Sequence, residues 1–266
     1  MRARKRFGQH FLTDPAVLER IGTVLALRAQ DKLLEIGPGN GALTEVLYGH
    51  CGRFVGVEID RDLIAALKAR FTQLEVVNAD ILRLDFREVF ASGDWRVAGN
   101  LPYNISTPLL VKLFAVTDLV RDMHFMVQRE VAVRLCASPG SKAWGRLTVL
   151  GQFHCRIEGL FDVSPESFKP APKVWSRVIR LTPRSEKLPL SDLGCLETVV
   201  RTAFSQRRKR VSNALKSFDF DWQAVGIEAD TRPDQLSVED FVKLANIFAL
   251  TSRAKEQKET EQCMGS

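Results

Sequence analysis

The feature that most constrains the fold is a regular alternation of apolar strand-like runs and helical patterns between residues 32 and 128. The strand-like runs are almost continuously apolar, which is typical of parallel strands that are covered on both faces. Helical segments separate them, as the crossovers of a parallel sheet require. The pattern therefore predicts a doubly wound α/β domain. Five strands are expected at 32–37, 53–60, 74–80, 95–99 and 123–128, and helices at 42–49, 61–71, 107–116 and 129–137.

The pattern changes beyond residue 150. Two more strand-like runs, at 151–163 and 173–183, are expected to close the same sheet, and helical patterns follow a polar linker at 185–189. We therefore predict three parts of the chain. They are a Rossmann-like domain over residues 1–185, a small α-helical domain over 186–251 and a polar, disordered tail over 252–266.

Composition excludes several classes of protein. A hydrophobic content of 45% with 26% charged residues is ordinary for a globular chain with a substantial core. Five cysteines without CxxC spacing give neither a disulfide framework nor a zinc site, and no metal is expected. The basic N-terminus lacks the apolar segment of a signal peptide, and no run reaches the about 20 apolar residues that span a bilayer. We expect a cytoplasmic protein that does not enter a membrane, and its net charge of +6 favours a polyanionic partner.

A glycine-rich turn joins the first predicted strand to the first predicted helix. The segment EIGPGNGALTE (35–45) has glycines at positions 37, 39 and 41, where bare backbone would let a ligand approach a helix N-terminus. The spacing is GxGxG and not the GxGxxG of dinucleotide enzymes, and Pro38 removes one N–H donor. Both facts count against a pyrophosphate ligand. A tight structural turn is the alternative interpretation.

Carboxylates end the next two predicted strands. Glu58 is placed to accept hydrogen bonds from both hydroxyls of a ribose, and Asp80 from an adenine amino group with Ile81 covering the ring. Separately, Glu58 could be a helix N-terminal charge and Asp80 an N-cap. Together with the glycines they share the edge of the sheet where doubly wound folds bind ligands. The combination indicates an adenosine without a pyrophosphate, and S-adenosylmethionine fits that description.

The tetrapeptide NLPY follows the fourth predicted strand and resembles the loop of enzymes that methylate amino groups. The side-chain oxygen of Asn100 and the carbonyl of Leu101 could accept from an adenine amine, which favours the tetrahedral nitrogen of the transition state. Pro102 would fix that backbone, and Tyr103 would stack on the base. If the segment is only a turn, its proline and the following Asn104 explain it and Tyr103 is a packing residue.

Six motifs carry a resemblance to the rRNA adenine dimethylase family over about residues 4 to 250, and in particular to its members that act on the bacterial small subunit. The resemblance implies a class I methyltransferase that uses S-adenosylmethionine to dimethylate two adjacent adenosines near the 3′ end of 16S rRNA. It also implies action late in the assembly of the 30S subunit, and we expect a monomer. The motifs lie at 4–12, 35–45, 100–110, 123–135, 167–181 and 203–215.

The resemblance also assigns site residues. The catalytic loop falls on Asn100, Leu101, Pro102 and Tyr103, and Phe168 matches a phenylalanine that stacks on the other face of the target base. The alternative interpretation of Phe168 is an aromatic side chain that packs on the neighbouring prolines. The N-terminal segment would fold over the methionine end of the cofactor, where His10 replaces a frequent asparagine and can still donate a hydrogen bond. The cofactor contacts fall on His10, Leu12, Gly37, Glu58, Asp80 and Asn100.

Basic clusters at 2–6 and 207–210 are predicted to contact RNA phosphates, although solvated surface charge is the alternative. The target base must also leave its stack to reach the loop. Two rival functions are a large-subunit rRNA dimethylase of the macrolide-resistance type and a non-catalytic assembly or transcription factor on the same fold. The sequence leaves open which adenosine is methylated first, whether naked RNA is a substrate and what residues 252–266 do.

Overall fold

The computed structural model describes the backbone of residues 10–264 and the side chains of residues 10–252. The basic cluster predicted at 2–6 therefore lies outside the described residues. The chain divides into two compact units, one formed by 1–136 with 154–183 and the other by 137–153 with 184–266. The first unit ends at Pro183, and residues 137–153, which the prediction placed in the N-terminal domain, group with the C-terminal helices.

The first unit is built on a seven-stranded sheet with the strand order β4-β3-β2-β5-β6-β9-β7. The five strands from β4 to β6 are parallel, and β9 runs antiparallel to both β6 and β7. A separate two-stranded antiparallel sheet pairs β1 with β8. The strands are β1 (Phe11–Leu12), β2 (Lys32–Ile36), β3 (Arg53–Glu58), β4 (Glu75–Asn78), β5 (Trp95–Asn100), β6 (Val120–Gln128), β7 (Cys155–Val163), β8 (Phe168–Lys169) and β9 (Ser176–Pro183).

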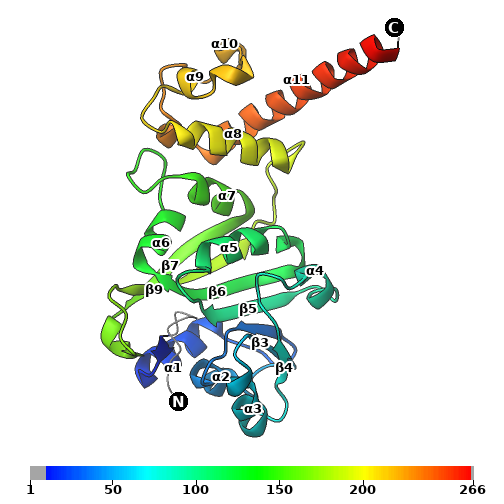
Figure 1. The fold of residues 1–266 in the computed structure, drawn as a ribbon. Coiled ribbons are helices and arrows are strands. Elements are labelled where there is room, and N and C mark those ends of the chain that lie inside the picture. Colours follow the sequence, from blue (N-terminus) through cyan, green and yellow to red (C-terminus); the bar gives the residue numbers. More distant parts are fainter. Residues whose placement is uncertain (1–9, 265–266) are drawn as a thin grey trace. The chain divides into compact units, whose positions relative to one another are not determined.

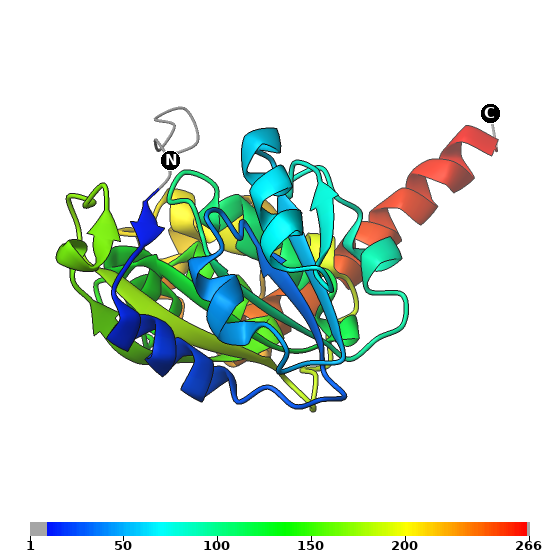
Figure 2. The same cartoon turned by 90° about the horizontal axis from the view of Figure 1, so that it is seen from below.

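Helices cover both faces of this sheet, as the continuous apolar strands require. One apolar cluster packs α1, α2 and α3 against Leu33, Ala98, Met126 and Val178 of the sheet, and these helices lie in front of the strands in Figure 2. Helix α5 lies on the other side of the sheet in Figure 1. The helices of this unit are α1 (Pro15–Leu25), α2 (Ala42–Leu47), α3 (Arg61–Arg70), α4 (Phe86–Val89), α5 (Ser106–Phe114) and α6 (Arg129–Leu135).

The start of α1 fixes the chain just before it. Asp14 is the N-cap, and its side chain accepts from the backbone N–H groups of Ala16 and Val17, with Pro15 at the first helical position. The other carboxylate oxygen of Asp14 accepts from the hydroxyl of Ser167 at 2.9 Å. This cap therefore ties the segment that carries β1 to the segment that carries β8.

The second unit is helical. Its core is a single apolar cluster that includes Trp144, Val200, Leu215 and Phe241. Its helices are α7 (Arg146–His154, whose last residue belongs to the first unit), α8 (Leu193–Ser205), α9 (Val211–Ala214), α10 (Trp222–Val225) and α11 (Val238–Met264), with 3-10 turns at Lys216–Phe218 and Pro233–Gln235.

Two local predictions were wrong. The expected strand 151–163 starts only at Cys155, because residues 151–154 finish helix α7, in which four consecutive residues are buried. The residues at 151–154 are Gly, Gln, Phe and His, which carry no local signal that separates the end of a helix from the start of a strand. The expected disordered tail is instead helical through Met264, consistent with its Lys, Glu, Gln and Arg residues, which favour helices.

No described helix is long and apolar enough to pass through a lipid bilayer. Within the described part of the chain, no group of three or more His, Cys, Asp or Glu side chains is arranged to hold a metal ion.

Candidate active site

A cavity of about 250 Å³ opens at the carboxyl ends of the parallel strands, within the first unit. The ends of several strands, which lie far apart in the sequence, contribute residues to the wall of this cavity. Residues of β1 line one of its sides. All the predicted site residues except Phe168 line this one cavity: His10, Leu12, Gly37, Glu58, Asp80, Asn100, Leu101, Pro102 and Tyr103.

The glycine turn has backbone conformations that favour glycine. Gly37 and Gly39 have φ angles of +65° and +60°, which side chains with a Cβ rarely adopt. A Cβ on Gly37 would meet no atom within 4 Å, because it would point into open space. The turn is thus required by the chain path and also leaves bare backbone beside the cavity, so the two interpretations of this motif are compatible.

Glu58 is held rigidly at the end of β3. Its side chain is 4% exposed, and its two oxygens accept backbone N–H groups from Gly39 at 3.0 Å and Asp60 at 2.8 Å. Burial raises the pKa of Glu58, although these hydrogen bonds oppose the change. Because each carboxylate oxygen can accept more than one hydrogen bond, Glu58 remains a fixed acceptor for the hydroxyls of a ligand.

Asp80 combines a structural contact with exposure to the cavity. One oxygen accepts from the backbone N–H of Leu82 at 2.9 Å, and the other lies 3.7 Å from the guanidinium of Arg83. The neighbouring Ile81 is 6% exposed and also lines the cavity. Asp80 therefore caps a turn and not a helix, unlike the N-cap alternative, and this contact does not prevent the carboxylate from accepting a ligand amino group.

The NLPY loop presents two acceptors to the cavity. The side-chain amide of Asn100 donates through Nδ2 to the main-chain carbonyl of His10 at 2.9 Å, which leaves Oδ1 as an acceptor. The N–H of Leu101 donates to the carbonyl of Met126 at 3.0 Å and so extends the pairing of β5 with β6. Among the described residues, no hydrogen bond to the Leu101 carbonyl is recorded, so that oxygen is also available.

Two contacts fix the side chain of Tyr103, one at its hydroxyl and one at its ring. Its hydroxyl is hydrogen bonded to the Ser176 hydroxyl at 2.8 Å, and its ring stacks on the imidazole of His10 with the centroids 5.6 Å apart. Burial raises the pKa of Tyr103 above its ordinary value of 10.0. The phenol is therefore neutral near pH 7 and is not a proton acceptor in that range.

His10 links three segments of the first unit. Its Nδ1 lies 2.7 Å from the carbonyl oxygen of Pro170, and because a carbonyl only accepts, this nitrogen carries the proton and donates. The same residue accepts from Asn100 through its main chain and stacks on Tyr103 through its ring. The N-terminal segment thus contacts both Asn100 and Tyr103, the first and last residues of the NLPY loop.

Phe168 is the exception among the predicted site residues. Its side chain is 2% exposed and belongs to the apolar cluster that contains Leu12, Met126 and Val178. It pairs with Leu12 across the β1–β8 sheet and does not line the cavity. Pairing with β1 thus places the ring in the core and not at the cavity, which agrees with the packing alternative, and the stacking role of Phe168 stays a prediction.

Two titratable residues of the cavity wall received no role from the sequence. Glu35 is 1% exposed and accepts from the Thr44 hydroxyl at 2.7 Å. Burial, aided by the nearby charge of Glu58, raises the pKa of Glu35 to about 8. His124 is 3% exposed, and its Nε2 accepts from Arg180 at 3.0 Å. Glu35 lies within the glycine-rich segment 35–45, so the sequence could have indicated that it belongs to the site. The sequence around His124 carried no such signal.

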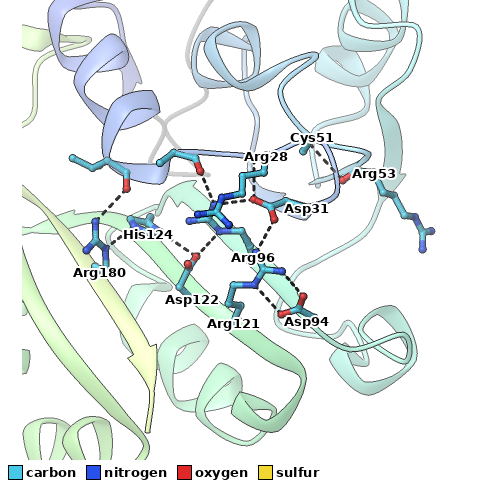
Figure 3. Close-up of polar contacts among 12 residues, drawn as sticks. Arg28, Asp31, Cys51, Arg53, Asp94, Arg96, Arg121, Asp122, His124 and Arg180 are labelled. Carbon is cyan, nitrogen blue, oxygen red and sulfur yellow. Dashed lines mark hydrogen bonds and ion pairs between the residues drawn. The ribbon is translucent and has the colours of Figure 1, made fainter. Parts of the chain in front are cut away.

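His124 also joins a network of buried charges in the first unit (Figure 3). The carboxylate of Asp31 has no exposed surface and accepts from Arg96 at 3.0 Å and from Arg121 at 2.6 Å. Arg96 donates in addition to Asp122 at 2.9 Å, and Asp122 lies 3.4 Å from Nδ1 of His124. Burial opposes the ionisation of Asp31, but its hydrogen bonds outweigh this and lower its pKa. The network joins the beginnings of β2, β5 and β6.

Comparisons with known proteins agree with this geometry. A family model described as ribosomal RNA adenine dimethylase matches residues 1–250. The chain is 51% identical over 252 residues to ribosomal RNA small subunit methyltransferase A of Alcanivorax borkumensis, covering 92% of this chain and 90% of the relative. It is 48% identical to the protein of the same name from Pseudomonas aeruginosa, with 93% and 95% covered.

Two solved structures share the fold over most of the length of this chain. A dimethyladenosine transferase from Plasmodium falciparum matches with a TM-score of 0.78 and 26% identity, covering 88% of this chain and 96% of that one. The 23S rRNA methyltransferase ErmE matches with a TM-score of 0.72 and 25% identity, covering 90% and 99%. The chain therefore belongs to the ribosomal RNA adenine dimethylase family of S-adenosylmethionine-dependent methyltransferases.

Proposed function

We propose that this protein dimethylates the exocyclic amines of two adjacent adenosines near the 3′ end of 16S rRNA, late in the assembly of the small ribosomal subunit. The observation that carries the proposal is that acceptors for an adenine amine, in the NLPY loop, share one cavity with Glu58 and Asp80. Relatives at 44–51% identity are named small subunit methyltransferase A, which favours the small subunit over the large one.

The residues of the cavity fit an adenosine-bearing cofactor. Glu58, already anchored by two backbone N–H groups, would accept from the ribose hydroxyls. Asp80 would accept from the adenine amine, and the buried Ile81 would cover the ring. Gly37 leaves room for the ligand beside its backbone. Leu12 and His10 would lie along the methionine end. When bound there, S-adenosylmethionine supplies an electrophilic methyl group.

The NLPY loop would activate the target amine. An adenine amine is a poor nucleophile because its lone pair is delocalised into the ring. Oδ1 of Asn100 and the carbonyl of Leu101 would both accept from it, and this stabilises the tetrahedral nitrogen that forms during attack. Pro102 keeps that carbonyl in a fixed place. The proton leaves after the nitrogen has become cationic, so the neutral Tyr103 need only stack on the base.

The helical unit offers a basic surface for RNA phosphates. Arg208, Lys209, Arg210 and Arg232 line a shallow pocket with Asn213 and Asp230. Arg210 is paired with Asp230 at 2.8 Å. Arg207 differs from its neighbours, because it donates to Asp234 at 3.2 Å and to the carbonyl of Lys142 at 2.8 Å. We propose that 208–210 and Arg232 contact phosphates and that Arg207 holds the unit together.

The test is methyl transfer from tritiated S-adenosylmethionine to undermethylated small subunits, with large subunits and free 16S rRNA as parallel substrates. We expect four methyl groups per small subunit, two on each of two adjacent adenosines, and none on large subunits. Transfer to large subunits alone would support the macrolide-resistance type instead. Binding of small subunits with no transfer would support a non-catalytic assembly factor. The protein is further proposed to be a cytoplasmic monomer, and light scattering of the free protein tests its oligomeric state.

A further inference from the structure

An exposed aromatic side chain stands close to the proposed active site. Trp175 is 50% exposed, and the preceding Val174 is 44% exposed. The chain has four tryptophans, and the others are placed differently. Trp95 and Trp144 are buried, and Trp222 packs partly buried against the core of the helical unit. A half-exposed tryptophan beside a second exposed apolar residue is typical of a contact surface.

The backbone of Trp175 is fixed to the catalytic loop through its neighbour. Its carbonyl accepts from the N–H of Arg129 at 2.9 Å. The next residue, Ser176, is fully buried and holds the hydroxyl of Tyr103 at 2.8 Å. Successive Cα atoms are about 3.8 Å apart. The main chain of Trp175 therefore lies one residue away from the group that anchors the proposed base-stacking ring.

Basic residues lie near this tryptophan along the chain and through its main-chain bond to Arg129. Lys173 is exposed two residues before it, in the connection between β8 and β9, and Lys169 is exposed at the end of β8. Arg129 is 56% exposed and pairs with Asp162 at 3.2 Å. An exposed aromatic ring among basic side chains is the combination with which proteins bind unpaired nucleotides, the ring by stacking and the cations through phosphates.

We propose that Trp175 is a stacking platform for an unpaired nucleotide that flanks the target adenosine. This inference depends on the proposed function, because a target base that leaves its stack exposes the faces of its neighbours. The nucleotide is chosen over a second copy of the chain because the basic side chains around the ring would repel an identical surface and attract an RNA backbone. Trp175 is then a substrate-positioning residue and not a catalytic one.

Fluorescence of the full-length protein tests the contact directly. The probe is a synthetic RNA hairpin with the sequence of the 3′ end of 16S rRNA. We expect the hairpin to quench part of the tryptophan emission, since stacking on a base quenches an indole. The Trp175→Phe variant should lose this quenching, and the matched variant Trp222→Phe should retain it. Equal quenching in the wild type and in Trp175→Phe would overturn the proposal.

Kinetics on undermethylated small subunits separate positioning from folding. Loss of one stacked base should raise KM for the subunits about 10-fold or more in Trp175→Ala, with kcat within about twofold. Trp175→Phe keeps a ring and should stay near the wild type, and all variants should bind S-adenosylmethionine equally. A Trp175→Ala variant with the wild-type KM would refute the platform while leaving the proposed function intact. An inactive wild type would refute the proposed function instead. A wild-type dimer that Trp175→Ala converts to a monomer would assign the surface to self-association and would also overturn the platform.

Discussion

The side-chain amide of Asn100 is bonded through Nδ2 to the main-chain carbonyl of His10, 90 residues earlier in the chain. The bond uses one donor of the carboxamide and so leaves Oδ1 as the end that can accept from a group in the cavity. Because the acceptor is a main-chain atom, the orientation of Asn100 does not depend on the side chain at position 10. An asparagine at that position, frequent in the family, would leave this contact unchanged.

We predict that Asn100→Ala lowers the rate of methyl transfer about 100- to 1000-fold, the usual effect of losing one preorganised acceptor for the transition state. RNA affinity should change little. The measurement is single-turnover transfer to undermethylated small subunits at saturating S-adenosylmethionine, which removes any effect on cofactor binding. Tyr103→Phe is the matched control, because it keeps the ring and loses only the bond to Ser176. Wild-type turnover by Asn100→Ala would show that NLPY is only a turn.

Glu58→Gln should weaken the binding of S-adenosylmethionine by roughly 1.5–3 kcal/mol, because the charged acceptor for the ribose is lost. Glutamine is preferred to alanine, since its one oxygen can still accept from one of the buried N–H groups of Gly39 and Asp60, whereas alanine would leave both without an acceptor. Calorimetric titration gives the affinity. The control is Glu45→Gln, which changes an exposed glutamate in helix α2. If both variants bind with wild-type affinity, Glu58 has no part in the cofactor site.

Glu35 should make stability depend on pH. Its pKa rises from 4.5 in the unfolded chain to about 8 in the folded protein, so the folded state keeps a proton that the unfolded state releases. The free energy of unfolding should therefore fall as the pH rises from about 5 to 8, by on the order of 3 kcal/mol at most. Glu35→Gln has no such proton, and its urea unfolding curves should change less across this range. Parallel pH profiles for the two proteins would contradict the assignment.

Arg96→Met should cost about 3–5 kcal/mol of folding free energy, because it leaves the buried carboxylates of Asp31 and Asp122 without a shared cation. Arg87→Met is the matched control. Its pair with Asp118 is exposed on both sides, and such pairs contribute about 1 kcal/mol or less. Equilibrium urea unfolding measures both. Similar losses for the two variants would mean that the network of Figure 3 adds no more than surface charge does.

Neutralising Arg208 and Lys209 together should weaken the binding of small-subunit RNA. The slope of log affinity against log salt concentration should also become shallower by about one to two. S-adenosylmethionine affinity should not change. Arg207 is left in place, since its bonds to Asp234 and Lys142 make its loss a structural change. The exposed Lys68 of helix α3, replaced by alanine, serves as a control for the general loss of charge. An unchanged slope in the double variant would return the cluster to solvated surface charge.

Much of the fold was predictable because its signals are local. Continuous apolar runs predicted the parallel strands, and the glycines at the end of β2 predicted the turn beside the cavity. Contacts between distant segments gave no such signal. The bond from Ser176 to Tyr103 spans 73 residues, and the pair of Arg96 with Asp31 spans 65. The burial of Phe168 gave no local signal either, since its environment depends on pairing with β1 and not on its neighbours in sequence.

The pairing of β1 with β8 also sets an order of events on the ribosome that makes this protein. His10 leaves the exit tunnel 160 residues before its partner Pro170, so a nascent chain that ends before β8 lacks the strand that pairs with β1 and keeps the contacts of His10 with Asn100 and Tyr103. Contacts of such long range form late and slowly. The wall that His10 and Leu12 give to the cavity can close only when synthesis has passed residue 170, after all five parallel strands have emerged. A growing chain is thus unable to complete this wall of the cavity until the whole parallel sheet is available to fold.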